Sequence, residues 1–126
     1  MWGMPRFVVL YHEMPTDHSR ASHYDLMLES GKLLRTWALA EAPNAAGTIP
    51  AELLNDHRQE YLAFEGEVTG GRGTVTRWDE GEYSTKEESA DAMKFLLKGG
   101  QLKGELLLRR DAGDSSRWHL HYEPAK

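Results

Sequence analysis

Hydrophobic and polar residues alternate along most of the chain, in short runs that end at Gly, Asn, Asp and Ser. Alternation at every second residue is typical of a β-strand that buries one of its two faces. The pattern predicts strands over residues 6–12, 23–29, 32–39, 60–68, 73–79, 94–97, 102–109 and 118–122. Many short strands are typical of a mainly β fold, either an antiparallel barrel or a sandwich.

Turn residues separate these predicted strands. They stand at Ser30-Gly31, Thr69-Gly70-Gly71, Lys98-Gly99-Gly100 and Asp111-Ala112-Gly113-Asp114. Two short helices are also predicted. One begins near Pro50 and continues through Ala51–Asn55, because Pro suits the first turn of a helix. The other spans Thr85–Met93, with acidic residues at its start as the helix dipole favours.

The length and composition indicate an ordinary globular protein. The 126 residues contain no visible repeat or linker, so we predict a single domain over residues 1–126. The chain has no Cys, which excludes disulfides and thiolate ligands and fits the reducing cytoplasm, where we expect this protein. We see no secretion signal and no apolar run near the ~20 residues of a membrane helix, so we expect no membrane association.

The net charge of −5 argues against a domain whose main task is to coat nucleic acid. A local phosphate site stays open, because several basic residues could line one face of the fold. For any one of them, the favoured interpretation is a scattered, solvated charge. These residues are Arg58, Arg72, Arg77, Lys98, Lys103 and Arg109.

The segment His23-Tyr24-Asp25 opens the predicted strand 23–29 and carries the clearest candidate chemistry. In a strand, His23 and Asp25 lie on the same face, and Tyr24 lies on the other. If strand 6–12 pairs beside this one, His12 can join them. Two histidines and one carboxylate can hold a divalent transition metal with coordination positions left open. Taken alone, this spacing is more often an ordinary polar strand surface.

Three other histidines are weaker candidates. His18 lies in a predicted loop, where a side chain is less firmly positioned than on a strand. His119 and His121 alternate with the apolar residues of strand 118–122, so we expect them on its exposed face. No carboxylate partner is evident beside them in the sequence. We therefore leave these three residues out of the predicted site.

Several short motifs follow one another in an order that resembles a known family. They are Phe7-Val8-Val9 before His12, His23-Tyr24-Asp25 with Glu29, Leu34-Arg35-Thr36-Trp37-Ala38, Asp56-His57 with Tyr61, Phe64-Glu65-Gly66, Gly73-Thr74-Val75 and Trp78-Asp79-Glu80-Gly81. Together they resemble the 3′-phosphoesterase domain of bacterial ligase D and its stand-alone relatives. The resemblance implies a small antiparallel β-barrel that repairs 3′ ends. It also implies a manganese-dependent reaction that removes a terminal ribonucleoside and leaves a 3′ phosphate. A second reaction can then remove that phosphate.

The resemblance also implies roles for individual residues. His12, His23 and Asp25 would be ligands for Mn²⁺, with Zn²⁺ or another divalent transition metal as alternatives. His57 and Tyr61 would act on the scissile phosphate. If His57 ends the helix near Pro50 and Tyr61 enters the next strand, both can project toward one mouth of the barrel. The alternative is a histidine that only ends a helix near its negative end. Because the metal motif is present, we favour the functional role.

Partners follow from the same resemblance. We expect DNA or RNA-terminated DNA 3′ ends as substrates, a repair ligase or polymerase as a further partner, and a monomeric protein.

Three positions depart from the family pattern. Met27, Glu41 and Ile49 stand where the family has cations that contact phosphate. Their loss should weaken phosphate binding, because a hydrogen bond to a charged group contributes ~1.5 to 3 kcal/mol. We expect Arg58 to bind substrate and to compensate in part. The loop after His12 is longer than in the family, and the glycine-rich turn at 69–73 is shorter.

Three functions therefore remain open. The leading hypothesis is a metal-dependent phosphoesterase that acts on nucleic-acid 3′ ends in DNA repair, as the intact histidines and Asp25 indicate. The second is a catalytically weakened barrel that binds a nucleic-acid end or a repair partner, as the missing cations and the acidic balance indicate. The third is a phosphoesterase for a small molecule, which an acidic surface would tolerate better.

Overall fold

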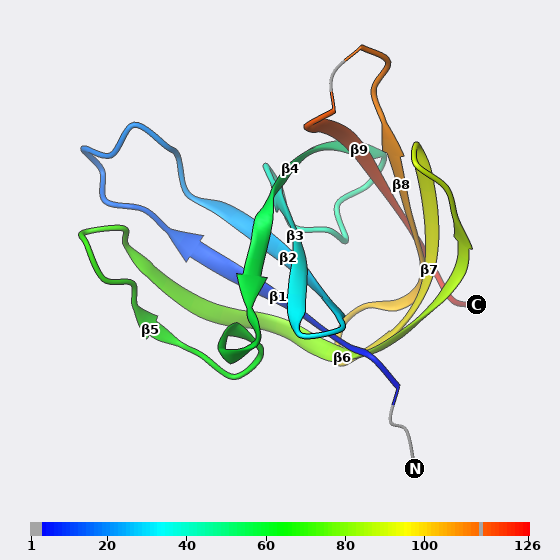
Figure 1. Ribbon diagram of the computed structural model, residues 1–126, viewed down its shortest axis with the longest axis horizontal. Coiled ribbons are helices and arrows are strands. Elements are labelled where there is room, and N and C mark those ends of the chain that lie inside the picture. The colour runs from blue at the N-terminus through cyan, green and yellow to red at the C-terminus, as the bar shows by residue number, and fades with distance from the viewer. Residues whose placement is uncertain (1–3, 114) are drawn as a thin grey trace.

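Antiparallel strands make up most of the structure, a computed structural model that describes residues 4–113 and 115–126. Within these residues they are β1 (Arg6–Glu13), β2 (His23–Ser30), β3 (Leu33–Leu39), β4 (Thr48–Arg58), β5 (Gly66–Glu67), β6 (Thr74–Glu88), β7 (Ala92–Gly99), β8 (Lys103–Arg110) and β9 (Arg117–Pro124). They form one sheet in the order β1-β2-β3-β4-β9-β8-β7-β6-β5, and β1 also pairs with β6. The sheet thus closes into a ring (Figure 1). The predicted mainly β, barrel-like fold is confirmed.

The helix predicted near Pro50 is wrong, because this segment is part of β4. Ile49 and Ala51 are buried while Pro50 and Glu52 are exposed, which is the alternation of a strand. The pairing of β4 with β3 starts at Ala51, so Pro50 faces a partner only in β9 and its missing N–H costs little. A short apolar run fits both the period of a helix and the two-residue period of a strand. Here, pairing with neighbouring strands overrides the helix propensity of the segment.

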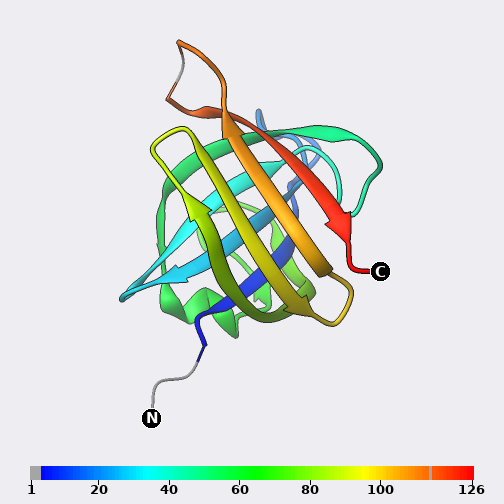
Figure 2. The ribbon, with the colours of Figure 1, turned by 90° about the vertical axis from the view of Figure 1, so that its right-hand side faces the viewer.

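The helix predicted over Thr85–Met93 is also wrong. Its first part continues β6, its last residues begin β7, and the two strands form a hairpin (Figure 2). The hydroxyl of Ser89 accepts a hydrogen bond from the N–H of Ala92 at 3.1 Å, which stabilises the turn between them. The acidic residues read as a helix start are exposed residues of the extended β6.

The strand predicted over 60–68 is mostly wrong. The structure has the 3-10 helix η1 (Gln59–Leu62) and then the two-residue strand β5. The remaining predicted strands agree with the structure to within a few residues, except that β6 extends well past 79. Among the described residues, no helix combines the length and apolar character needed to cross a membrane. The last residue of the predicted turn at 111–114, Asp114, lies outside the described residues.

Two apolar clusters bury both faces of β1 and β2. The larger fills the ring and contains Phe7, Leu26, Trp37, Phe95 and Leu106, each at most 1% exposed. The smaller lies on the opposite face, where Val8, Leu10 and Met27 pack with Tyr61 and Phe64 of the segment that contains η1. Burial on both faces explains the uninterrupted apolar run at the start of β1. It also means that the face of β1 and β2 opposite the ring interior is covered over part of its length.

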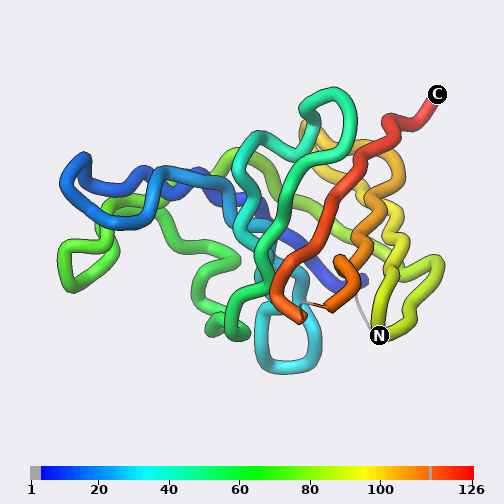
Figure 3. The backbone as a smooth tube through the Cα atoms, turned by 90° about the horizontal axis from the view of Figure 1, so that it is seen from above, coloured from blue at the N-terminus to red at the C-terminus, as the bar shows by residue number. Residues whose placement is uncertain are grey.

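The turn between β5 and β6 lies against the end of β1, at the left of Figure 1 and again in Figure 3. Gly73 makes this approach possible. Its φ is +82°, and a Cβ there would lie 2.0 Å from the carbonyl oxygen of Glu13. Gly70 and Gly71 also have positive φ, as the predicted turn requires. The close approach fixes the position of Arg72 relative to β1.

Asp79 explains the Trp78-Asp79-Glu80-Gly81 motif in structural terms. Its buried carboxylate accepts hydrogen bonds from the N–H groups of Gly100, Gln101 and Leu102, at 2.8, 3.0 and 2.8 Å. These three groups belong to the turn between β7 and β8. The motif therefore ties β6 to this turn, and its Trp78 packs edge-on against Tyr24, which stands between His23 and Asp25 in the sequence.

Candidate metal centre

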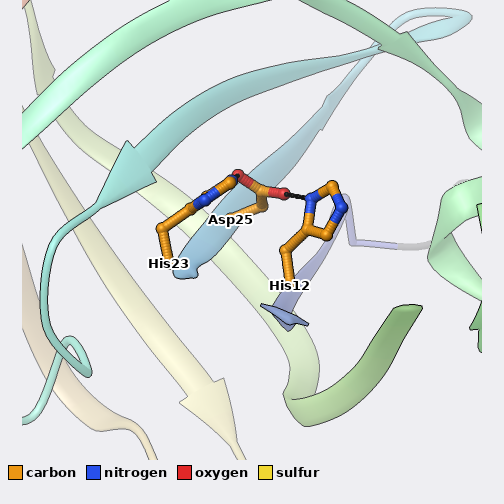
Figure 4. A group of neighbouring side chains, drawn as sticks. All are labelled: His12, His23 and Asp25. Carbon is orange, nitrogen blue, oxygen red and sulfur yellow. Dashed lines mark hydrogen bonds and ion pairs between the residues drawn. The ribbon is translucent and has the colours of Figure 1, made fainter. Parts of the chain in front are cut away.

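His12, His23 and Asp25 converge where β1 ends and β2 begins (Figure 4). His12 and His23 are direct partners in the strand register. Nδ1 of His12 lies 3.3 Å from Oδ2 of Asp25, and Nε2 of His23 lies 3.1 Å from Oδ1. In the described part of the chain, these three form the one group of ligand atoms close enough, within 4.8 Å, to hold a metal ion. The structure brings the three predicted ligands together and leaves His18 outside the group.

Two backbone carbonyls fix both imidazoles. Nδ1 of His23 lies 2.9 Å from the carbonyl oxygen of Ala21, and Nε2 of His12 lies 2.6 Å from that of Arg72. A carbonyl only accepts, so each of these nitrogens donates its N–H. A neutral imidazole has one N–H, so the nitrogens that face Asp25 carry lone pairs. Two lone pairs and a carboxylate repel one another unless a cation or a proton lies between them.

The burial and charge of Asp25 also fit a metal. Its Oδ1 is buried and has no partner with hydrogen-bond geometry, although Nε2 of His23 is near. Burial by itself raises the pKa of Asp25, but contacts with His12 and His23 outweigh it and hold this pKa below its usual value. Burial by itself lowers the pKa of His23, but the close, negatively charged carboxylate of Asp25 raises this pKa overall. The carboxylate is therefore charged at neutral pH. Two nitrogens and one anionic oxygen suit a divalent transition metal.

His57 and Tyr61 lie together, although on different elements from those predicted. His57 is in β4, opposite Leu34, and Tyr61 is in η1. Their ring centroids are 5.6 Å apart with the rings nearly perpendicular. Nδ1 of His57 lies 2.9 Å from the carbonyl oxygen of Asn55, so this nitrogen also donates and Nε2 stays available. The predicted helix end at His57 and strand at Tyr61 are wrong.

The same two side chains line a small hollow of about 440 Å³, together with Arg58 and Arg72. Arg58 is largely exposed and forms an ion pair with Glu60 at 2.9 Å. Arg72 connects the candidate metal centre with this hollow. Its carbonyl holds the ring of His12, and the residue also lines the hollow. Sequence reasoning named Arg72 only as one of six basic residues. No local signal singles it out, since its position depends on the pairing of β1 with β6.

The positions where the family has cations do not border this hollow. Met27 and Ile49 are each 1% exposed, in the smaller cluster and in the ring interior respectively. Glu41 is exposed in the segment between β3 and β4. Of the six basic residues considered from the sequence, Arg58 and Arg72 line the hollow. Arg77 forms an ion pair with Glu80 at 2.7 Å.

His119 and His121 have carboxylate partners that the sequence did not reveal. Nδ1 of His119 lies 2.5 Å from Asp111, and Nε2 of His121 lies 3.0 Å from Glu123. The expectation that no carboxylate stands near them is therefore wrong. The hydrogen bond to Glu123 is the main reason why the pKa of His121 lies above its usual value. Neither pair belongs to the group of possible metal ligands found in the described residues.

Comparison with protein families matches residues 15–110 to the DNA ligase D 3′-phosphoesterase domain. The matched segment contains His23, Asp25, His57 and Tyr61 and begins past His12. The position of His12 at the centre thus comes from the strand register and the geometry.

Two curated relatives are similar over nearly the whole chain. The multifunctional non-homologous end joining DNA repair protein LigD of Mycobacterium tuberculosis is 34% identical over 124 residues, which cover 91% of this chain. The multifunctional non-homologous end joining protein LigD of Pseudomonas aeruginosa is 31% identical over 130 residues, which cover 94%. The chain spans about 15% of the length of each of these relatives.

Proposed function

The chain belongs to the DNA ligase D 3′-phosphoesterase domain family, and on this basis we propose that it is a metal-dependent phosphoesterase that processes nucleic-acid 3′ ends. Its substrates are DNA ends that carry a 3′-terminal ribonucleoside, a 3′ phosphate, or both in succession. The names of the two relatives refer to non-homologous end joining. They support a role in DNA repair beside a repair ligase or polymerase.

His12, His23 and Asp25 would hold Mn²⁺ or another divalent transition metal such as Zn²⁺. The ion, when bound, supplies positive charge that neutralises phosphate oxygens. The carbonyls of Ala21 and Arg72 keep both rings oriented with a lone pair toward the ion. The low pKa of Asp25 keeps the third ligand anionic.

His57 would handle a proton in this reaction. In the hydrolysis of a 3′-terminal ribonucleoside, the oxygen of water forms a bond to phosphorus and releases a proton to solvent, and the bond from phosphorus to the leaving oxygen breaks. The leaving oxygen takes up one proton and departs as the hydroxyl of the free ribonucleoside. Nδ1 of His57 is held by Asn55, so Nε2 is the atom that can carry this proton to the hollow. The hydroxyl of Tyr61, in the same hollow, can donate a hydrogen bond to a phosphate oxygen.

Arg58 and Arg72 supply the positive charge of the hollow. Nε of Arg72 donates to the carbonyl of Thr69 at 2.8 Å, which leaves its terminal nitrogens for a phosphate. Arg58 would give up its ion pair with the exposed Glu60 and bind a phosphate of the substrate instead. These two cations line the hollow that holds His57 and Tyr61, whereas Met27, Glu41 and Ile49 do not border it.

The observation that carries this proposal is the pair of imidazole nitrogens aimed at a buried, charged carboxylate. The test is incubation of the purified protein with Mn²⁺ and two end-labelled primer-templates, one ending in a ribonucleotide and one in a 3′ phosphate. We expect a 3′-phosphate product from the first and a 3′-hydroxyl product from the second. Chelation should stop both reactions.

Two variants make this assay specific. His12→Ala should abolish cleavage, while His18→Ala, which removes an exposed histidine outside the group, should behave as wild type. Binding of the primer-templates without cleavage would favour the binding-module hypothesis. Cleavage that persists in His12→Ala would rule out the proposed metal centre.

A further inference from the structure

Arg72 differs from most arginines of this protein in its lack of a carboxylate partner. Asp and Glu outnumber Lys and Arg in the chain by 20 to 15. Six other arginines each form an ion pair with a carboxylate, namely Arg6, Arg20, Arg35, Arg58, Arg77 and Arg110. Arg72 is exposed and forms no ion pair among the described residues. Its charge is therefore available to an anion from outside the chain.

The backbone and the side chain of Arg72 hold different parts of the site. The carbonyl oxygen accepts a hydrogen bond from Nε2 of His12 at 2.6 Å. The side chain bends back over its own turn, where Nε donates to the carbonyl oxygen of Thr69 at 2.8 Å. The residue also lines the hollow of His57 and Tyr61. One residue of a short turn thus contacts a proposed metal ligand and borders the hollow.

The turn between β5 and β6 is closed at its base and exposed at its tip. The N–H of Val68 donates to the carbonyl oxygen of Gly73 at 2.8 Å, and Gly73 lies directly against Glu13 at the end of β1 (Figure 3). Residues 69–72 are exposed, and two of the four are glycines with positive φ. Glycine gives a backbone many accessible conformations. The two bonds of Arg72 therefore restrict a segment that has conformational freedom to lose.

Ordering of this turn links the two sites. When Nδ1 of His12 ligates an ion, the ring becomes a stronger N–H donor, and its bond to the Arg72 carbonyl holds the turn more firmly. An anion on the guanidinium of Arg72 restricts the same turn through the side chain. Whichever ligand binds first orders the turn, so the second ligand loses less conformational entropy when it binds.

We propose that Arg72 is a positioning residue that couples the hollow to the metal centre, so that a phosphate group on its guanidinium and a divalent ion on the three ligands strengthen each other's binding. The inference rests on the proposed function for the identity of both ligands. It adds that the centre holds its ion more tightly when a 3′ end occupies the hollow.

Arg58 provides the matched contrast. It lines the same hollow and carries the same charge. Its ion pair is with Glu60, and in the described part of the chain it has no hydrogen bond to the turn or to the three ligands. A loss of charge effects alone would therefore be common to Arg58 and Arg72, whereas the coupling should depend on Arg72.

The test is isothermal titration of Mn²⁺ into the protein, with and without phenylphosphonate at a saturating concentration for each variant. The C–P bond of this probe is not hydrolysed. The ratio of the two dissociation constants for Mn²⁺ measures the coupling, and we expect a ratio of about 10 in the wild type. Arg72→Lys keeps the charge but loses the separate nitrogens that hold Thr69 and the anion, so its ratio should fall to about 2 or less. Arg58→Lys should weaken phenylphosphonate binding and keep the wild-type ratio.

Two results would overturn the inference even if the wild type cleaves 3′ ends. A wild-type ratio near that of Arg72→Lys would show that the ligands act independently or attract each other directly. An equal loss of the ratio in Arg58→Lys and Arg72→Lys would assign the effect to the charge of the hollow.

A measurement without metal separates this inference from the proposed function. Multiple-bond proton–nitrogen NMR spectra of the metal-free protein follow the ring nitrogens of His12. Phenylphosphonate should shift these signals in the wild type and leave them unchanged in Arg72→Lys, and equal shifts in both would refute the link between Arg72 and His12. A wild type that binds no Mn²⁺ would count against the proposed function, while these spectra would still decide the link.

Discussion

The ring of His12 and the backbone of Arg72 are joined by a hydrogen bond of 2.6 Å, although the two residues are 60 positions apart in the sequence. The bond ties the candidate metal centre, which belongs to the β1–β2 pair, to the glycine-rich turn before β6. It fixes which nitrogen of His12 faces Asp25. The turn is therefore part of the site, and its glycines can be tested as such.

Gly73→Ala should lower the affinity for Mn²⁺ about 10- to 100-fold, as the loss of a contact that orients a metal ligand commonly does. The new Cβ would collide with the carbonyl of Glu13, which displaces the turn and the Arg72 carbonyl. Gly71→Ala is the matched control. Its φ is also positive, at +67°, but no atom lies within 4 Å of the added Cβ. Isothermal titration should show loss of affinity in Gly73→Ala alone, and equal affinities would refute the role of the turn.

His57→Ala should reduce kcat about 10² to 10⁴-fold while the metal content stays at the wild-type level. His57 lies in the hollow with Tyr61 and is no member of the ligand group found in the described residues. Turnover and metal content should be measured on the same preparation. A variant that loses its metal together with its activity would show that His57 belongs to the metal centre.

Asp79→Ala should lower the free energy of unfolding by about 3 kcal/mol, because three backbone N–H groups lose a charged acceptor. Glu80→Ala, which removes an exposed neighbour paired with Arg77, should cost less than about 1 kcal/mol. Urea unfolding measures both values. The affinity for Mn²⁺ should be unchanged in both variants, and equal costs would contradict the anchoring role of Asp79.

The contribution of Tyr83 to stability should depend on alkaline pH. Burial is the main reason why the pKa of Tyr83 lies above its usual value of 10.0. The hydroxyl donates to the carbonyl of Glu29 at 2.5 Å, so the folded state favours the protonated form. This stability is fully present below the unfolded pKa and is lost as the pH rises through the folded pKa.

Urea unfolding between pH 8 and pH 11 tests this expectation. Tyr83→Phe should be less stable by about 1 kcal/mol at pH 8. The difference from wild type should shrink as the pH approaches the folded pKa. A difference that stays constant over this range would mean that the Tyr83 hydroxyl is not held in its protonated form.

The candidate metal centre could be predicted from the sequence because its geometry is local. Alternation places His23 and Asp25 on one face of a strand, and pairing of two successive strands then brings His12 beside them. The contacts that orient these ligands could not be predicted. The Arg72 carbonyl reaches His12 only through the pairing of β1 with β6, which no local pattern specifies.

The errors in secondary structure have a similar origin. Residues 50–55 have helix-forming composition, and only the pairing of β4 with β3 and β9 makes them a strand. The apolar run from Tyr61 to Phe64 is predicted as part of a strand, yet Tyr61 and Phe64 cover the smaller apolar cluster from η1 and the residues that follow it. The carboxylate beside His119 was missed because Asp111 lies eight residues away, across a turn.

The most direct test of the proposed function is the turnover of a ribonucleotide-terminated primer-template as Mn²⁺ is titrated into metal-free wild type and Asp25→Asn. Asp25→Asn keeps the shape of the buried side chain but removes the anionic ligand between His12 and His23. We predict that wild-type turnover rises from near zero and saturates with about one ion per chain, whereas Asp25→Asn needs at least about 100-fold more Mn²⁺ or stays inactive. Turnover in the metal-free protein, or the same dependence on Mn²⁺ in both proteins, would contradict a metal-dependent phosphoesterase centred on these three residues.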